Sequence, residues 1–137
     1  IDQADIDIDI GIYGFIPEEI IPQAELRLSI YKEISSIKEN KNLEQNKKDF
    51  IDRFGDVTSE ITNLYELSKL KNIARKLNIL GIKYRDENFS LKLADDSRLI
   101  PPSSKIREIK VSAKDIKSDR LTFIMSKLES FLDKNEI

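Results

Sequence analysis

The sequence predicts an α+β fold in which an N-terminal strand and a three-helix body precede a small, mainly antiparallel sheet and a C-terminal helix. Two changes in the spacing of apolar residues predict this order. Apolar and polar residues alternate near the start, apolar residues then recur every three to four positions, and alternation returns after about residue 79. The length of 137 residues suits one domain, which needs no disulfide to fold, and the chain contains no cysteine.

Near the N-terminus, aspartate alternates with isoleucine in the stretch ADIDIDIGIY. A period of two places Asp5, Asp7 and Asp9 on one face of a strand and the isoleucines on the other. Three carboxylates at this spacing also open an EF-hand calcium loop. That loop needs a glycine at its sixth position and a glutamate at its twelfth, where this chain has Ile10 and Ile16. The stretch is therefore predicted to be a strand and not a metal site.

Three antiparallel helices with short connections are predicted to follow a bend at Pro17 and Pro22, because proline disfavours helix in the residue before it. The first helix is expected over about residues 23–38 and the third over about residues 58–77. In both segments apolar residues recur at intervals of three and four, which is typical of a helix that lies on a core.

The second helix is predicted over about residues 43–54. Asn42 has the side chain of a helix cap, and Gln45 follows it by three residues, which resembles a capping box. Gly55 has the residue type favoured just after a helix C-terminus. Residues 39–42 are therefore expected to separate the first helix from the second.

The last third of the chain has the pattern of strands. Apolar residues alternate on both sides of the sequence RDEN, which predicts a hairpin. A further strand is expected in KIREIKVSA, with Ile106, Ile109 and Val111 as its apolar residues. Ser118 is the predicted cap of a final helix. The apolar stripe of this helix consists of Leu121, Ile124, Met125, Leu128 and Phe131.

Composition excludes several classes of function. Without histidine and cysteine, the chain cannot form Ser-His or Cys-His triads or a thiolate zinc site. The formal net charge is only -2, although the first 20 residues hold six acids and no bases. No apolar run approaches the roughly 20 residues of a membrane span. We therefore expect a soluble cytoplasmic protein, and the absence of an initial methionine suggests a piece of a longer one.

Two alternative functions are predicted from the C-terminal part. Asp95 or Asp96, followed by Glu108 and Lys110, has a spacing used by metal-dependent nucleases, in which carboxylates hold magnesium. The basic tract at residues 103–120 alternatively suggests a DNA-binding module that contacts phosphates. An exposed strand and an ordinary solvated surface explain the same residues.

The second helix combines an apolar flank with a charged one. Phe50 and Phe54 lie close together on a helical wheel, and Asp49, Asp52 and Arg53 share a neighbouring arc. Asp49 and Arg53 are expected to form an i, i+4 ion pair. Asp52 lies in the last turn, where a carboxylate opposes the helix dipole at a cost of about 0.3 to 1 kcal/mol. A partner that carries arginine or lysine would explain why an aspartate occupies this unfavourable position. Asp52 can equally be an ordinary surface acid without a function.

Three stretches together resemble the C-terminal domain of the bacterial transcription-repair coupling factor (Mfd) family: IPEEIIPQAELRLSIYKEIS, DFIDRFGD and NLYELSKLKNIARKLNILGI. The resemblance covers about residues 4–84. The family pattern is a strand, an I-P-x-x-x-I-P bend, R-L-x-x-Y-K, E-L-x-D-R-F-G and a long helix that ends in L-G-I. Asp49 and Phe50 replace the family's Glu and Leu, and the proline usual after the glycine is absent. Four further positions match: Arg27, Leu28, Tyr31 and Lys32.

The resemblance implies that residues 1–137 form a single C-terminal regulatory domain of a larger multidomain protein. Its parts are a strand and proline bend (1–20), a helical part (22–78), and a hairpin, strand and last helix (79–137). The full protein is similar to an ATP-dependent DNA translocase, a helicase-like hydrolase that displaces RNA polymerase stalled at DNA damage and recruits nucleotide excision repair. This domain is expected to be no enzyme and to bind no cofactor, whereas ATP and magnesium serve the parent motor.

The resemblance also implies a partner. The domain is expected to dock on the parent's own N-terminal UvrB-like module and to hide the surface that binds UvrA, which is a form of autoinhibition. The charged family residues at that interface map to Asp49, Asp52 and Arg53, while Phe54 and Gly55 are expected to be structural. The parent is expected to bind RNA polymerase, UvrA and duplex DNA but no membrane, and the isolated domain is expected to be a monomer.

Overall fold

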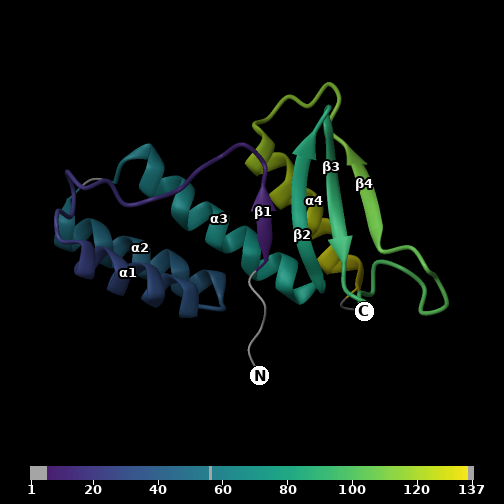
Figure 1. Cartoon of the computed structure of the whole chain (residues 1–137), viewed down its shortest axis with the longest axis horizontal. Coiled ribbons are helices and arrows are strands. Elements are labelled where there is room, and N and C mark those ends of the chain that lie inside the picture. The colour runs from purple at the N-terminus through teal and green to yellow at the C-terminus, as the bar shows by residue number, and fades with distance from the viewer. Residues whose placement is uncertain (1–5, 56, 136–137) are drawn as a thin grey trace. The chain divides into compact units, whose positions relative to one another are not determined.

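The structure, a computed structural model, describes residues 6–55 and 57–135. Its elements are β1 (Asp7–Asp9), α1 (Ala24–Ser36), α2 (Asn40–Phe54), α3 (Ser59–Lys76), β2 (Ile79–Arg85), β3 (Asn88–Leu93), β4 (Glu108–Ser112) and α4 (Arg120–Asn135) (Figure 1). The chain divides into two compact units: unit 1 contains the described parts of residues 1–11 and 73–137, and unit 2 contains residues 12–72. The predicted α+β class is confirmed.

Unit 2 is built from α1, α2 and most of α3. Hydrogen bonds join Asn72 to Asn40 and Tyr65 to Asn46, so α3 runs antiparallel to α2. Asn46 also bonds Glu33 of α1, which lies antiparallel to α2 across a short connection. The core between the helices consists of buried side chains from the bend and all three helices: Ile16, Ile21, Ile30, Ile34, Leu43, Phe50, Ile61 and Tyr65.

Two residues of the R-L-x-x-Y-K pattern fasten the proline bend to α1. One guanidinium nitrogen of Arg27 donates hydrogen bonds to the carbonyl oxygens of Ile21 (2.8 Å) and Pro22 (2.9 Å). The hydroxyl oxygen of Tyr31 accepts a hydrogen bond from the backbone N–H of Ile16 at 2.6 Å. Both polar side chains therefore satisfy backbone groups that the bend leaves outside regular secondary structure.

Unit 1 contains a four-stranded sheet in the order β1-β2-β3-β4. β1 pairs with β2 in parallel, and the other pairs are antiparallel. The predicted hairpin is confirmed: Asp86 and Glu87 connect β2 to β3 with φ values of 53° and 60°, as in a type I′ turn. Helix α4 lies on one face of the sheet (Figure 1), where Phe123 stacks on Phe89 with ring centroids 5.9 Å apart.

Helix α2 begins three residues earlier than predicted. Glu39 precedes it without capping it through its side chain, and Asn42 and Gln45 lie inside the helix, so the predicted capping box is wrong. The cause is a tertiary contact: the Asn40 amide donates a hydrogen bond to the carbonyl oxygen of Lys69 in α3. This contact fixes the first helical turn, which the sequence pattern assigned to a break.

Two predictions near the C-terminus also need correction. Ile106 lies outside β4 and is 56% exposed. The cap of α4 is Asp119 and not Ser118, because the Asp119 carboxylate accepts hydrogen bonds from the backbone N–H and the hydroxyl group of Thr122, at 2.8 and 3.0 Å. The bond from the Thr122 N–H is the main cause that holds the pKa of Asp119 below its usual value.

The predicted N-terminal strand is present but short. Asp7 and Asp9 are exposed while Ile6 and Ile10 are buried, so the predicted two faces are confirmed for these residues. Asp5 lies outside the described residues. Within residues 6–55 and 57–135, no three acidic side chains gather into a group that could hold a metal ion, and no helix is long and apolar enough to cross a membrane.

Candidate interaction site on helix α2

The C-terminal half of α2 carries the predicted site residues. Phe50 is buried in the core of unit 2, and its ring centroid lies 4.8 Å from that of Phe54 and 6.4 Å from that of Tyr65. Phe54 is half-buried against the same core. Gly55 follows the helix with φ of 93°, and its N–H donates a hydrogen bond to the carbonyl oxygen of Ile51. This backbone conformation favours glycine although no atom would obstruct a side chain.

Asp49, Asp52 and Arg53 are all exposed. The expected ion pair between Asp49 and Arg53 does not form. Asp49 instead accepts a hydrogen bond from the amide nitrogen of Gln45 at 3.0 Å, and the Arg53 guanidinium lies 4.8 Å from the centroid of the Phe54 ring. An exposed helical ion pair contributes only about 0.3 to 0.5 kcal/mol, so stacking of the planar guanidinium on an adjacent ring competes with it successfully.

Asp52 differs from its neighbours. Across the part of the chain that the structure describes, its carboxylate has neither a hydrogen-bond nor an ion-pair partner. It stays in the last turn of α2, where the partial negative charge of the helix terminus opposes it. The helix thus presents an exposed carboxylate next to an arginine that stacks on Phe54, and neither charge is paired within the part of the chain that the structure describes.

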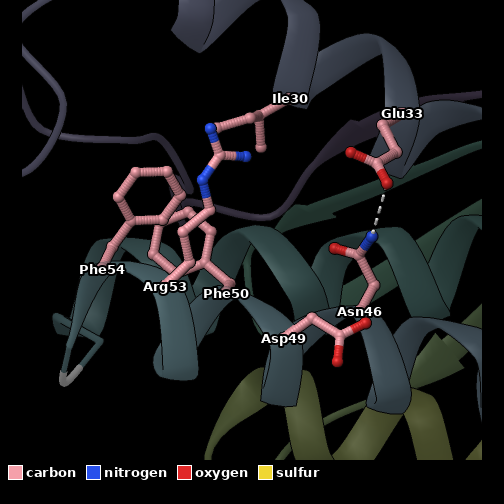
Figure 2. A pocket seen from close by; sticks show the side chains of 7 residues that line it. All are labelled: Ile30, Glu33, Asn46, Asp49, Phe50, Arg53 and Phe54. Atoms are coloured by element: carbon pink, nitrogen blue, oxygen red, sulfur yellow. Dashed lines mark hydrogen bonds between the residues drawn. The ribbon is translucent and has the colours of Figure 1, made fainter.

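A surface pocket of about 100 Å³ opens between α1 and α2 beside these residues (Figure 2). Three predicted site residues line it, namely Asp49, Arg53 and Phe54, whereas Asp52 and Gly55 do not. The complete lining consists of Ile30, Glu33, Asn46, Asp49, Phe50, Arg53 and Phe54.

Sequence reasoning missed Glu33 and Asn46 as members of the site. They lie on different helices, 13 residues apart. Glu33 follows the R-L-x-x-Y-K pattern within a matched stretch but is not one of the pattern's residues, and Asn46 lies outside all three matched stretches. The available signal was the predicted antiparallel arrangement of the first two helices, which brings the end of one beside the start of the other.

The alternative sites in unit 1 receive no support. Asp95 forms an ion pair with Arg107 at 2.7 Å, and Arg107 also donates to the carbonyl oxygens of Ser104 and Ile106. Asp96, Glu108 and Lys110 are exposed, the last two on β4. Within residues 6–55 and 57–135, these acids belong to no group of three that could hold a metal ion, and the other residues of the basic tract at 103–120 are largely exposed.

Comparison with known proteins gives a consistent answer. The family model described as "TRCF domain" matches residues 10–104, which is more than half of the chain. Proteins named transcription-repair-coupling factor are similar to it. The one from Rickettsia conorii is 30% identical, and the match covers 95% of this chain and 11% of that protein. The one from Rickettsia bellii is 28% identical, and the match covers 88% of this chain and 11% of that protein. The Escherichia coli protein is 28% identical over a match that covers 69% of this chain and 8% of that protein.

The chain therefore spans about a tenth of the length of the curated relatives it matches. Among solved structures, the crystal structure of the C-terminal domain of a transcription-repair coupling factor has a TM-score of 0.77 at 20% identity. The match covers 98% of this chain and 97% of that domain, which shows that the two share a fold. Together with the family match, these findings establish that the chain belongs to the TRCF domain family, the family of the C-terminal domain of transcription-repair coupling factors.

Proposed function

We propose that this domain docks on the N-terminal UvrB-like module of its own parent protein and masks the surface that binds UvrA. Similarity to coupling factors supports the broader role in transcription-coupled DNA repair. The parent is an ATP-dependent DNA translocase of the bacterial cytoplasm that displaces stalled RNA polymerase and recruits nucleotide excision repair. ATP and magnesium serve that motor, whereas this domain is not an enzyme and acts by binding.

The observation that supports the proposal most directly is the state of Asp52 and Arg53. Both are exposed at the end of a helix that Phe50 anchors in the core, so their positions are defined although their charges are unpaired among the described residues. The carboxylate of Asp52 costs its own helix about 0.3 to 1 kcal/mol. A complementary charged surface on another part of the parent would interact favourably with this carboxylate, and the binding free energy would offset the local cost.

A weak interaction is sufficient for such docking. If the tether supplies an effective concentration of about 1 mM and the separated pieces bind with a Kd of about 10 μM, the docked state is populated roughly 99% of the time. Removal of one member of a buried charge pair costs about 2 to 5 kcal/mol. A loss of about 3 kcal/mol raises Kd by about 150-fold and leaves the docked state populated less than half the time.

The test uses the full-length parent with Asp52→Ala or Arg53→Ala. We expect both variants to bind UvrA more tightly and to hydrolyse ATP faster without DNA, while the far-UV circular dichroism of the domain stays unchanged. Glu108→Ala is the matched control, since Glu108 is an exposed acid on β4 in unit 1. Wild-type UvrA binding and ATPase rates in both α2 variants would contradict the proposal.

A further inference from the structure

Two aromatic side chains of unit 2 project into solvent just before the proline bend. Tyr13 is 73% exposed and Phe15 is 46% exposed. Exposure alternates along this stretch, since Gly14 lies against α3 and Ile16 is buried in the core. Single exposed apolar residues are common on protein surfaces, but two rings on the same side of one segment form a small apolar patch. We call Tyr13 and Phe15 the aromatic pair.

The backbone that carries the aromatic pair is fixed on α3. A Cβ atom added at Gly14 would lie 2.3 Å from a backbone nitrogen of α3, so only glycine fits and the segment packs directly on the helix. The N–H of Phe15 donates a hydrogen bond to the carbonyl oxygen of Glu60 at 3.2 Å. The side-chain amide of Asn63 donates one to the carbonyl oxygen of Tyr13 at 3.3 Å. Because this backbone is already ordered, a partner that binds the two rings loses less affinity to ordering entropy.

The charges around the aromatic pair are negative. Residues 12–22, which include the pair, and residues 57–66, which include the first turns of α3, contain four glutamates and no lysine or arginine. Two of these glutamates form ion pairs with bases elsewhere in unit 2, whereas Glu19 and Glu60 have no ion-pair partner among the described residues. A hydrogen bond from its own backbone N–H is the main cause that holds the pKa of Glu60 below its usual value, so this carboxylate is ionised at neutral pH.

We propose that the aromatic pair and Glu60 form an interaction surface for a basic segment of a partner protein, with an arginine of that segment stacked on the rings. Cations bind over the faces of aromatic rings, and a planar guanidinium group stacks on them better than a lysine ammonium does. Alternate residues of an extended segment lie about 7 Å apart, so one guanidinium group can contact both rings. None of these residues belongs to the charged docking face of α2, so the inference is independent of the proposed docking.

The composition of the same two stretches argues against a nucleic acid as the partner. Bases of a single strand also stack on exposed aromatic rings, but such sites provide lysine or arginine for the phosphates. Residues 12–22 and 57–66 provide only acids, which repel phosphates.

The test titrates the isotope-labelled 137-residue chain with a dodecapeptide of alternating arginine and serine and follows the backbone amide shifts by NMR. We expect the largest shifts at the aromatic pair and in the first two turns of α3. A lysine-serine peptide of equal length and charge should bind at least threefold more weakly, because ammonium groups stack less well on the rings. A glutamate-serine peptide should cause no shift in this region.

The double variant Tyr13→Ser with Phe15→Ser should raise the Kd of the arginine peptide at least tenfold, and Glu60→Gln should raise it about threefold. Replacement of both rings by leucine keeps apolar side chains at the two positions but removes the stacking, and should weaken binding nearly as much as the serine pair. Leu80→Ser is the matched control, because Leu80 is a 43% exposed apolar residue of unit 1. This control and Asp52→Asn should each change Kd less than twofold.

Three results would overturn the inference: amide shifts that lie away from the aromatic pair, an unchanged Kd in both double variants, or tighter binding of the glutamate peptide. A thymidine oligonucleotide of twelve nucleotides is the competing probe. If it binds more tightly than the arginine peptide and loses this binding in the serine double variant, the surface takes single-stranded nucleic acid and the inference is wrong. None of these results affects the docking of α2, which UvrA binding by the full-length parent tests separately.

Discussion

Helices α2 and α4 belong to different units, and each carries an aspartate at one end. Asp119 precedes α4, where the helix dipole favours a negative charge, and it accepts two hydrogen bonds from Thr122. Asp52 lies at the opposite end of its helix, where the dipole disfavours it, and has no partner among the described residues. The charge of Asp119 stabilises its own helix, whereas the charge of Asp52 is exposed and available to a partner outside this domain.

The same distinction separates the two arginines of the family pattern within unit 2. Arg27 uses one nitrogen to satisfy two carbonyl groups of the proline bend. Arg53 stacks on a neighbouring ring and leaves its N–H groups without a protein acceptor in the described part of the chain. The first arginine therefore contributes to the fold, and the second is suited to a contact outside this domain.

The largest expected effect comes from removal of the anchor of α2. Phe50 is 5% exposed, and truncation of a buried phenylalanine costs about 3 to 5 kcal/mol, so Phe50→Ala should lower the free energy of unfolding of unit 2 by that amount. Urea denaturation followed by circular dichroism measures the loss. Phe15→Ala is the control, because that ring is 46% exposed, and we expect it to cost less than about 1 kcal/mol. A loss below 1 kcal/mol for Phe50→Ala would show that α2 is not held through this ring.

High pH should destabilise unit 2 through Tyr65. Its pKa is raised to about 12 in the folded chain, mainly by burial, from an ordinary value of 10.0. The resulting stabilisation is complete below pH 10 and is lost as the pH rises toward 12, about 2 kcal/mol by pH 11.5. Tyr65→Phe should lack this component. The measurement compares unfolding free energies at pH 9 and pH 11.5, and equal losses in both proteins would contradict it.

The cap of α4 is expected to contribute about 1 kcal/mol, so Asp119→Ala should lower the free energy of unfolding by that amount at pH 7. The folded-state pKa of Asp119 lies below its ordinary value of 3.8, so the contribution is present above that pH and fades as the pH falls below it. Ser118→Ala is the control and should have little effect. A larger loss of unfolding free energy for Ser118→Ala than for Asp119→Ala would show that Ser118 is the cap, as the sequence predicted.

The smallest expected effect on stability is an increase, whereas the preceding substitutions lower it. Asp52→Asn should raise the free energy of unfolding by about 0.3 to 1 kcal/mol at low ionic strength, because it removes a charge that opposes the dipole of α2. Added salt should reduce the gain through screening. Thermal unfolding at two salt concentrations measures it. A clear loss of stability would mean that Asp52 has a stabilising partner within the domain, and the contrast with Asp119 would disappear.

Local patterns in the sequence were sufficient for much of the fold. Apolar spacing predicted α1 and α3 to within two residues, and the sequence RDEN predicted the hairpin between β2 and β3. The start of α2 was missed because the Asn40 side chain bonds α3, a contact that is distant in sequence. The parallel pairing of β1 with β2 was missed for the same reason, since 69 residues separate the two strands.

The candidate site was predictable only in part. The helical wheel placed Asp52 and Arg53 on the surface, where the structure also has them. The helical wheel does not distinguish stacking of Arg53 on Phe54 from an ion pair between Arg53 and Asp49, because these two arrangements differ in free energy by less than about 1 kcal/mol. Glu33 joins the site through the packing of α1 on α2, which no local pattern specifies.

The most direct test is the affinity of the 137-residue chain for the N-terminal half of its parent, measured for the wild type and for Asp52→Asn. If the charge of Asp52 serves docking within the parent protein, this substitution should weaken binding at least tenfold while the domain itself becomes no less stable. Equal affinity of the two proteins would show that the charged end of α2 faces only solvent, and the docking proposal would be wrong.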